Sequence, residues 1–280
     1  MGGSAAAALS DELLDVAVEA ARAAGEVLLD HYVHGAGDVT TKSSPTDLVS
    51  EADVAAERAI RDLLAARRPD DAILGEEGDD IAGSSGLRWV VDPLDGTVNY
   101  LFGIPQWAVS VACEGQVGVI LDPVRDELFS VRVGETALLD GHPLHGPPVR
   151  DLGTAMVSTG FGYDARVRAS QAEVVARLLP KVRDIRRLGS AALDLAWLAA
   201  GRYDAYYEHG LNPWDWAAGE MLCSAAGLAV RHLDPLPATG AGLLVARPEL
   251  IDDLAAIDGR RFRSNVARRS TRSRSLRARR

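Results

Sequence analysis

The feature that most constrains the fold is a block of apolar stretches between Leu87 and Val133. The stretches read RWVV, WAVSVAC, VGVILD and ELFSVRV, and short turns at Asp95-Gly96 and Glu114-Gly115 separate them. Runs of this length, rich in β-branched residues and bounded by turn residues, are typical of strands. The sequence therefore predicts an antiparallel meander in the first half of the chain.

Two helices are expected before this meander. Ser10 is a suitable N-cap, acids follow it in the first turn, and apolar residues recur from Leu14 to Leu28 at helical spacing. A second helix is expected from Ser50 to about Ala66. The first half of the chain is thus predicted to be α+β.

Strands and helices alternate after a Gly-, Pro- and His-rich segment at Gly141–Pro148. MVSTG, VRDIRRL, DAYYE and GLLVA are predicted strands, and the predicted helices are Ser170–Leu179, Ser190–Ala200, one opened by Asp215, and one from Pro248 to about Gly259. This alternation favours an α/β layered structure. We expect a flexible N-terminus at 1–9, an α+β subdomain with most metal ligands at 10–148, an α/β subdomain at 149–259 and a disordered arginine-rich tail at 260–280.

Composition narrows the class of protein. With 280 residues and 47% hydrophobic side chains, the chain can bury a sizeable core. No stretch approaches the ~18 apolar residues of a membrane span, and the alanine-rich start lacks the charged region of a signal peptide, so we expect a cytoplasmic protein.

Cys113 and Cys223 are too few for a disulfide framework and are expected to be buried thiols. The formal net charge is −10, but ten arginines lie in residues 260–280. The rest of the chain is therefore more acidic than the net charge suggests.

Three short segments combine carboxylates with turns: Gly75-Glu76-Glu77, Asp92-Pro93-Leu94-Asp95-Gly96-Thr97 and Pro213-Trp214-Asp215. Converging carboxylates raise each other's pKa unless a cation neutralises them. Oxygen ligands without neighbouring His or Cys favour Mg²⁺ over zinc. The amides of Gly96 and Thr97, where a helical turn begins, are suited to an anion such as phosphate.

Each segment also has a purely structural interpretation. Asp92 and Asp95 fit a strand followed by an Asp-Gly turn, and Glu76-Glu77 fits an exposed surface pair. Asp215 fits an N-cap, and Asp53 fits the acid of a capping box that starts at Ser50.

Longer segments resemble the inositol monophosphatase family of metal-dependent phosphatases. The resemblance runs from about Leu13 to Ile257, and its segments are TKSSPTDLVSEAD, ILGEEG, WVVDPLDGTVNYLFGIPQWAVSVA, GVILDPVRDELF, RRLGSAALDLAWLAAGRYDAYYEHG and PWDWAAG. The DPLDGT and PWD motifs occur in the right order about 120 residues apart. The resemblance implies a layered αβαβα sandwich of the inositol monophosphatase and fructose-1,6-bisphosphatase type, with the metal site between its two halves.

The resemblance also implies roles for residues. One Mg²⁺ is expected on Glu76, Asp92 and the Leu94 carbonyl, a second on Asp92, Asp95 and Asp215, and a weaker third on Glu76. Asp53 and Thr97 are expected to orient and deprotonate the attacking water. The amides of Gly96 and Thr97 would bind phosphate, while Asp95, Ala191 and Glu208 would bind the alcohol. Lys42 matches a family lysine near the site, with an exposed loop charge as the alternative.

We therefore expect a Mg²⁺-dependent phosphatase that hydrolyses inositol 1-phosphate or a similar polyol phosphate, and the family default is a homodimer. A relative specific for histidinol phosphate, a sugar bisphosphate or a nucleotide is the alternative within the same chemistry. An alternative from another class is a partner for RNA or a transcription complex that binds through 260–280.

Overall fold

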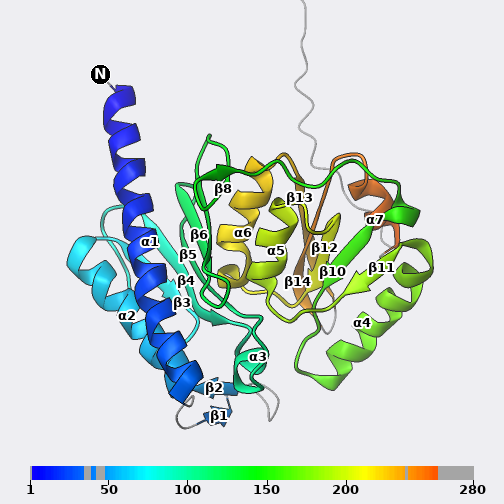
Figure 1. Cartoon of the computed structure of the whole chain (residues 1–280), viewed down its shortest axis with the longest axis horizontal. Coiled ribbons are helices and arrows are strands. Elements are labelled where there is room, and N and C mark those ends of the chain that lie inside the picture. The colour runs from blue at the N-terminus through cyan, green and yellow to red at the C-terminus, as the bar shows by residue number, and fades with distance from the viewer. Residues whose placement is uncertain (1, 35–38, 42–47, 237–238, 258–280) are drawn as a thin grey trace, which may run out of the picture.

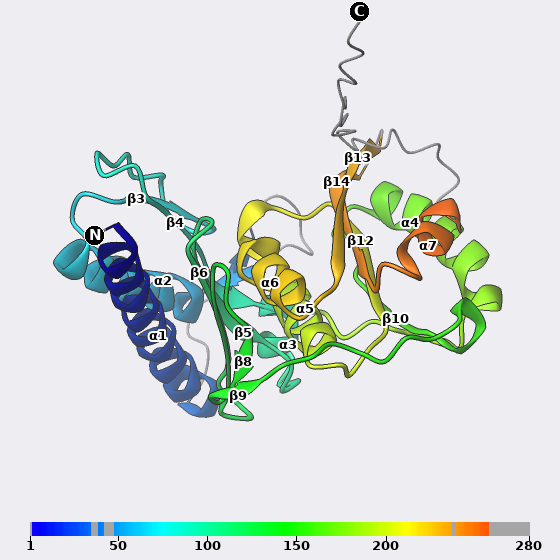
Figure 2. The ribbon, with the colours of Figure 1, turned by 90° about the horizontal axis from the view of Figure 1, so that it is seen from above.

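The protein is built from five alternating layers of helix and sheet (Figure 1; Figure 2). The computed structural model describes residues 2–34, 39–41, 48–236 and 239–257. Helices α1 and α2 form one outer layer, a seven-stranded sheet follows, α5 and α6 fill the middle, and a five-stranded sheet separates them from α4 and α7. The predicted αβαβα sandwich is confirmed.

The seven-stranded sheet contains the predicted meander. Its order is β3-β4-β5-β6-β7-β8-β9, with bounds β3 Ala72–Gly75, β4 Arg88–Asp95, β5 Ala108–Cys113, β6 Val117–Asp122, β7 Glu127–Arg132, β8 Leu138–Leu139 and β9 His142–Pro143. β4 to β7 pair antiparallel in sequence order, which confirms the prediction. The edge strand β3 pairs parallel to β4 and was not predicted, because its four residues show no alternation to detect.

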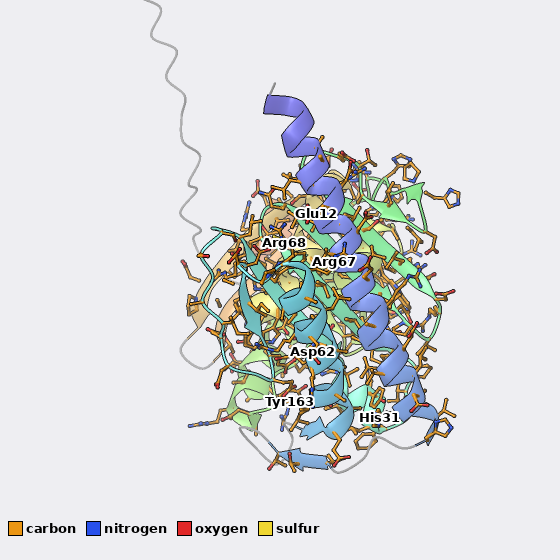
Figure 3. The ribbon with its side chains drawn as sticks, turned by 90° about the vertical axis from the view of Figure 1, so that its left-hand side faces the viewer. Glu12, His31, Asp62, Arg67, Arg68 and Tyr163 are labelled. Atoms are coloured by element: carbon orange, nitrogen blue, oxygen red, sulfur yellow. The ribbon has the colours of Figure 1, made fainter. Side chains whose placement is uncertain are left out.

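The outer layer consists of α1, Gly2–His34, and α2, Glu51–Arg67, which lie side by side against the sheet (Figure 3). The start predicted at Ser10 is wrong: the run Ala5–Ala8 has high helix propensity and continues the helix back to Gly2. The second helix is confirmed, with Ser50 as its N-cap. Ion pairs join the two helices, including Arg68 to Glu12 at 3.1 Å. A short antiparallel pair, β1 Val39–Thr41 and β2 Leu48–Ser50, precedes α2.

The five-stranded sheet is mixed rather than purely parallel. Its order is β11-β10-β12-β14-β13, with bounds β10 Met156–Thr159, β11 Asp184–Arg186, β12 Ala205–His209, β13 Ala229–Leu236 and β14 Gly240–Ala246. β10 runs parallel to β11 and β12, whereas β14 runs antiparallel to both β12 and β13. β13 was missed because charged residues and a proline interrupt its apolar pattern.

The remaining helices are α3 Thr97–Leu101, α4 Ala165–Leu178, α5 Ala191–Ala199, α6 Pro213–Ala225 and α7 Ile251–Ile257. Single 3-10 turns lie at Leu152–Thr154 and Leu179–Lys181. α5 begins after Ser190, as predicted. α4 begins five residues before the predicted Ser170, because Asp164 caps it. α7 begins three residues after Pro248.

Three apolar cores hold the five layers together, and the middle one contains residues of both sheets around α5 and α6. Strand β5 serves two of them, since Val109 and Val111 pack under α1 and α2 while Ala108 and Ala112 face α5 and α6. The middle helices approach the sheet closely, and a Cβ on Gly118 would lie 3.0 Å from the Cα of Ala218 in α6. The third core joins the five-stranded sheet to α4 and α7. This close packing fixes α6 relative to the first sheet.

Two further sequence expectations concern thiols and membranes. Cys113 and Cys223 are free and buried, as expected. Among the helices of the described residues, none combines the length and the apolar character that a membrane crossing requires.

The outer core is predicted to be sensitive to truncation. Ile60 of α2 is fully buried, so Ile60→Ala should lower the free energy of unfolding by about 2–5 kcal/mol, measured by urea denaturation. Val54 lies on the same helix with 55% of its surface exposed, and Val54→Ala should change stability by less than about 0.5 kcal/mol. Equal losses in the two variants would contradict the assigned burial.

Candidate active site

The segment from Asp92 to Thr97 turns the end of β4 into the start of α3. Oδ1 of Asp92 accepts a hydrogen bond from the Leu94 amide at 3.0 Å, and the β4–β5 register shifts between Asp92 and Asp95. Gly96 has a φ of +99°, and a Cβ there would lie 2.9 Å from the Gln106 carbonyl oxygen, so only glycine suits this turn. The two aspartates thereby point from one strand end into the same space.

Asp53 is attached to this turn through Thr97. Its Oδ2 accepts from the Ser50 amide at 2.8 Å, which completes a capping box at the start of α2. Its Oδ1 lies 3.0 Å from the Thr97 hydroxyl, and that hydroxyl is 3.1 Å from the Leu94 carbonyl oxygen. The structural interpretation of Asp53 is therefore correct, and the same side chain contacts the cavity residue Thr97, although Asp53 does not itself line the cavity.

Asp95 is held at the N-terminus of α5. Its Oδ2 accepts from the Ser190 hydroxyl at 2.5 Å and from the Ala192 amide at 2.6 Å. The hydroxyl of Ser190 also accepts from the Leu193 amide as the N-cap of α5. Asp95 thus joins the first sheet to the middle layer with one carboxylate oxygen, and its other oxygen is not used in these bonds.

Asp215 lies in the first turn of α6, but it does not open that helix. The N-cap is Asn212, and the prediction of Asp215 as the N-cap is wrong because a reciprocal capping box starts at Asn212 with Asp215 at its third position. Oδ2 of Asp215 accepts from the Asn212 amide at 2.7 Å. The carboxylate is fixed at the helix N-terminus, where negative charge is favourable.

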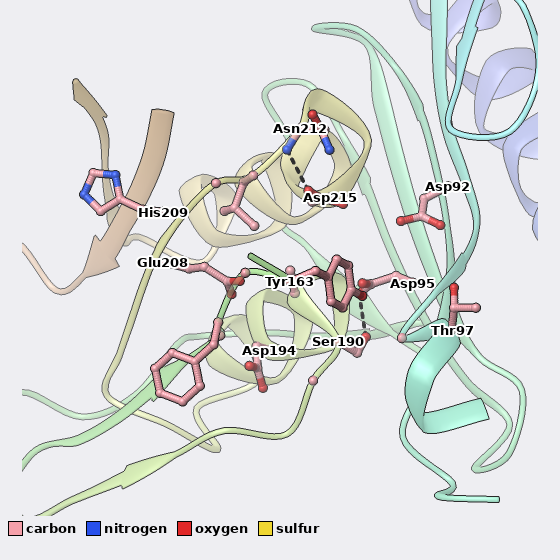
Figure 4. Close-up of a pocket in the computed structure, with 18 of the residues that line it drawn as sticks. Asp92, Asp95, Thr97, Tyr163, Ser190, Asp194, Glu208, His209, Asn212 and Asp215 are labelled. Carbon is pink, nitrogen blue, oxygen red and sulfur yellow. Dashed lines mark hydrogen bonds between the residues drawn. The ribbon is translucent and has the colours of Figure 1, made fainter. Parts of the chain in front are cut away.

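Three of these carboxylates form one cluster (Figure 4). One oxygen from each of Asp92, Asp95 and Asp215 lies within 4.8 Å of the other two. Glu76, at the end of β3, is near enough to Asp92 for its charge to raise the pKa of Asp92. The structure therefore brings together the four carboxylates that the sequence analysis assigned to metal binding.

The electrostatics of the cluster favour a cation. Burial, and then the negative charges of Glu76, Asp95 and Asp215, raise the pKa of Asp92 well above its usual value. Burial is also the largest cause for Asp95, whose pKa rises to about 6, and for Asp215, whose pKa is raised well above its usual value. Oxygen donors that repel one another in a buried site are suited to a hard divalent cation, which would remove the repulsion. The donor set fits Mg²⁺.

The cluster lies at the wall of a cavity of about 580 Å³. Other predicted site residues line it: Leu94, Gly96, Thr97, Ala191 and Glu208. Glu208 comes from β12, and its Oε2 accepts from the Tyr206 hydroxyl at 2.8 Å. Burial raises the pKa of Glu208 to about 7. Lys42 lies outside the described residues.

Several cavity residues were not found from the sequence. They are Ser190 and Asn212, which hold the aspartates, together with Phe161, Tyr163, Arg187 and Asp194. The capping positions of Ser190 and Asn212 were detectable signals, whereas the others come from loops and helix faces without a motif. His209, which follows Glu208 in β12, also lines the cavity and is buried.

Comparisons with known proteins agree with this arrangement. The model of the inositol monophosphatase family matches residues 9–256. The chain belongs to this family. It is 46% identical over 237 residues to inositol-1-monophosphatase SuhB of Mycobacterium tuberculosis. This aligned region covers 79% of this chain and 81% of that protein.

Two further relatives cover similar shares of the chain. Nus factor SuhB of Escherichia coli is 40% identical over 77% of this chain and 83% of its own length. The structure of inositol monophosphatase from Anabaena superposes with a TM-score of 0.75 at 35% identity, covering 88% of this chain and 94% of that one. The chain is therefore a phosphatase of the metal-dependent inositol monophosphatase family.

The raised carboxyl pKa values predict a pH-dependent effect of Mg²⁺ on stability. A carboxyl whose pKa is raised by folding stabilises the protein fully below its unfolded value, and this contribution is lost as pH rises through about 6 for Asp95. At about pH 7.5, saturating Mg²⁺ should raise the Tm by about 5–10 °C, because the cation neutralises ionised carboxylates. At about pH 5 the carboxyl groups must first lose their protons before Mg²⁺ can bind. The rise in Tm caused by Mg²⁺ should therefore be much smaller.

Differential scanning calorimetry with and without Mg²⁺ measures both shifts. The Asp92→Asn variant is the control, and its Tm should respond little to Mg²⁺ at either pH. Equal shifts at the two pH values in the unmodified protein would contradict the assigned electrostatics.

Proposed function

We propose that this phosphatase hydrolyses inositol 1-phosphate, or a similar small polyol phosphate, to the alcohol and inorganic phosphate with Mg²⁺ as cofactor. The observation that carries the proposal is the convergence of Asp92, Asp95 and Asp215 beside a cavity whose wall also contains Glu208. One part of the cavity suits a phosphate with its cations, and another suits hydroxyl groups. The name of the relative from Mycobacterium tuberculosis supports the same substrate.

Two or three Mg²⁺ ions would be held by Glu76, Asp92, the Leu94 carbonyl, Asp95 and Asp215. Bound Mg²⁺ supplies positive charge that makes a water more acidic and stabilises the leaving oxygen of an in-line displacement. The hydrogen bonds at Ser190, Ala192 and Asn212 fix two of these carboxylates beforehand, so little reorganisation is needed at the moment of reaction.

Asp53 and Thr97 are suited to orient the attacking water. The Thr97 hydroxyl contacts Oδ1 of Asp53, while Oδ2 of Asp53 is kept in the capping box. A water hydrogen-bonded to Thr97 oxygen could pass its proton through this hydroxyl to the buried carboxylate. This contact supports Asp53 as the proton acceptor and Thr97 as the residue that positions the water and relays its proton.

The phosphate and the alcohol are assigned to neighbouring parts of the cavity. Gly96 and Thr97 begin α3, where backbone N–H groups lack helical acceptors and favour an anion. Asp95, Ala191 and Glu208 line the cavity beside them. A carboxylate accepts hydrogen bonds from hydroxyl groups, so Glu208 favours a polyol over an alcohol with an aromatic group.

Loss of one cluster carboxylate should abolish activity. Asp92→Asn should lower kcat/KM for inositol 1-phosphate by about 1000-fold, because the asparagine weakens cation binding at the centre of the cluster. Phosphate release is measured over a range of Mg²⁺ concentrations. Activity that stays unchanged in Asp92→Asn, or in the unmodified enzyme without Mg²⁺, would refute the proposed chemistry. A preference of about tenfold for histidinol phosphate or fructose 1,6-bisphosphate would refute the substrate alone.

Glu208 should determine the preference for hydroxyl-bearing substrates. Glu208→Gln should lower kcat/KM for inositol 1-phosphate by about 10- to 100-fold, because a charge-assisted hydrogen bond becomes a neutral one. The effect on phenyl phosphate, which offers no hydroxyl group, should stay below about threefold. Glu220→Gln on α6 is the matched control, since Glu220 pairs with His232 outside the cavity and should leave both substrates unaffected. Equal losses on both substrates would remove Glu208 from alcohol recognition.

We also propose that the enzyme acts as a homodimer, on the basis of its family. Binding of RNA or a transcription partner through 260–280 stays a prediction, since that segment lies outside the described residues. The relative named Nus factor SuhB keeps that second role worth testing.

A further inference from the structure

A buried carboxylate on α2 has no part in the reaction described above. Glu57 has 2% of its surface exposed and lies one helical turn after Asp53. Arg61 lies one further turn along, so the three side chains share a face of the helix. This face is turned toward the segments that carry Thr97 and Glu76.

Glu57 uses both carboxylate oxygens to hold the segment that follows Glu76. Its Oε2 accepts from the Glu77 amide at 2.8 Å, and its Oε1 accepts from the Gly78 amide at 2.8 Å. Oε1 also accepts from Nε of Arg61 at 2.6 Å. The next two backbone amides after Glu76 are therefore both bound to one side chain of α2.

The chain from Gly75 to Asp79 folds closely around this ion pair. Arg61 donates from Nη1 to the Asp79 carbonyl oxygen at 2.9 Å. A Cβ on Gly75 or Gly78 would lie 2.7 Å or 2.8 Å from Oε1 of Glu57. The two glycines that flank Glu76 and Glu77 are thus needed for this approach.

Glu76 needs such support for an electrostatic reason. Its negative charge lies near Asp92, which is itself close to Asp95 and Asp215, and like charges repel. Glu76 also follows β3, an edge strand of the seven-stranded sheet, whose other side is held only by an isolated bridge between Ile73 and Ile81 in the part of the chain that the structure describes. Without an anchor, repulsion would favour conformations in which Glu76 turns away from the cluster.

We propose that Glu57 is a positioning residue that holds Glu76 toward Asp92 before a cation binds. Because Glu57 and Asp53 are on one rigid helix, α2 sets the place of Glu76 relative to the Asp53–Thr97 pair. The inference rests on the proposed function, in which Glu76 is a metal ligand. Partners behind a metal ligand contribute to cation affinity without touching the ion.

The test compares Mg²⁺ binding in Glu57→Gln with that of the unmodified protein. A glutamine has one acceptor oxygen, and its NH₂ group would face the amides, so at least one of the two backbone bonds is lost. The Mg²⁺ concentration for half-maximal activity should rise by about 10- to 100-fold, with kcat at saturating Mg²⁺ within about twofold. Calorimetric titration of the substrate-free protein with Mg²⁺ should give the same loss of affinity.

Hydrogen exchange supplies a readout that does not depend on activity. In the Mg²⁺-free protein, Glu57→Gln should speed amide exchange in a peptide that covers residues 74–80, and saturating Mg²⁺ should restore protection. The second variant, Gly78→Ala, leaves Glu57 in place but pushes the segment away from it, and should weaken Mg²⁺ binding in the same direction. This variant keeps the test valid if Glu57→Gln does not fold.

Asp204→Asn is the matched control for loss of a buried carboxylate. Asp204 accepts from the Met156 amide at 2.8 Å and from Arg150 at 2.9 Å, in the five-stranded sheet away from the cluster. It should lower the Tm but leave Mg²⁺ affinity unchanged. Unchanged Mg²⁺ affinity in both Glu57→Gln and Gly78→Ala would overturn the inference. If Asp92→Asn is also fully active, the proposed function itself has failed; if it is inactive, only the role of Glu57 has.

Discussion

Repulsion among Asp92, Asp95, Asp215 and Glu76 is the constraint on which the arrangement of the site depends. Four acidic groups near one another, with Asp92 buried and the other three half-buried, destabilise a fold unless local bonds hold them and a cation is available. The raised pKa values of Asp92, Asp95 and Asp215 reflect that cost. The layered architecture tolerates it because the cores on either side of the seven-stranded sheet are closely packed.

Helix starts provide most of the local bonds. Asp53 and Asp215 are each the third residue of a capping box, and Asp95 accepts from the residues that begin α5. A capping bond fixes the rotation of a carboxylate through one oxygen. The same residue can therefore stabilise its helix and contribute to the site, so a place in a capping box and the proposed role in the site do not exclude each other.

The sequence allowed prediction of the elements whose signals are local. The β4–β7 meander has long β-branched runs, and α2 and α5 have serine caps, so all were found. β13 and β3 were missed because tertiary pairing, rather than composition, makes them strands. The four carboxylates were identified through family resemblance and turn chemistry. The anchoring by Glu57 and Ser190 was not, since it depends on contacts between residues far apart in the chain.

The middle layer has a consequence for synthesis of the chain on the ribosome. One face of the seven-stranded sheet is covered by α5 and α6, which are translated after all seven strands. Until Ala225 emerges, a nascent first half would expose that apolar face together with an acidic cluster that lacks Asp215. The chain therefore has a window during translation in which its own packing does not yet cover this apolar face, and exposed apolar surface of this kind promotes aggregation.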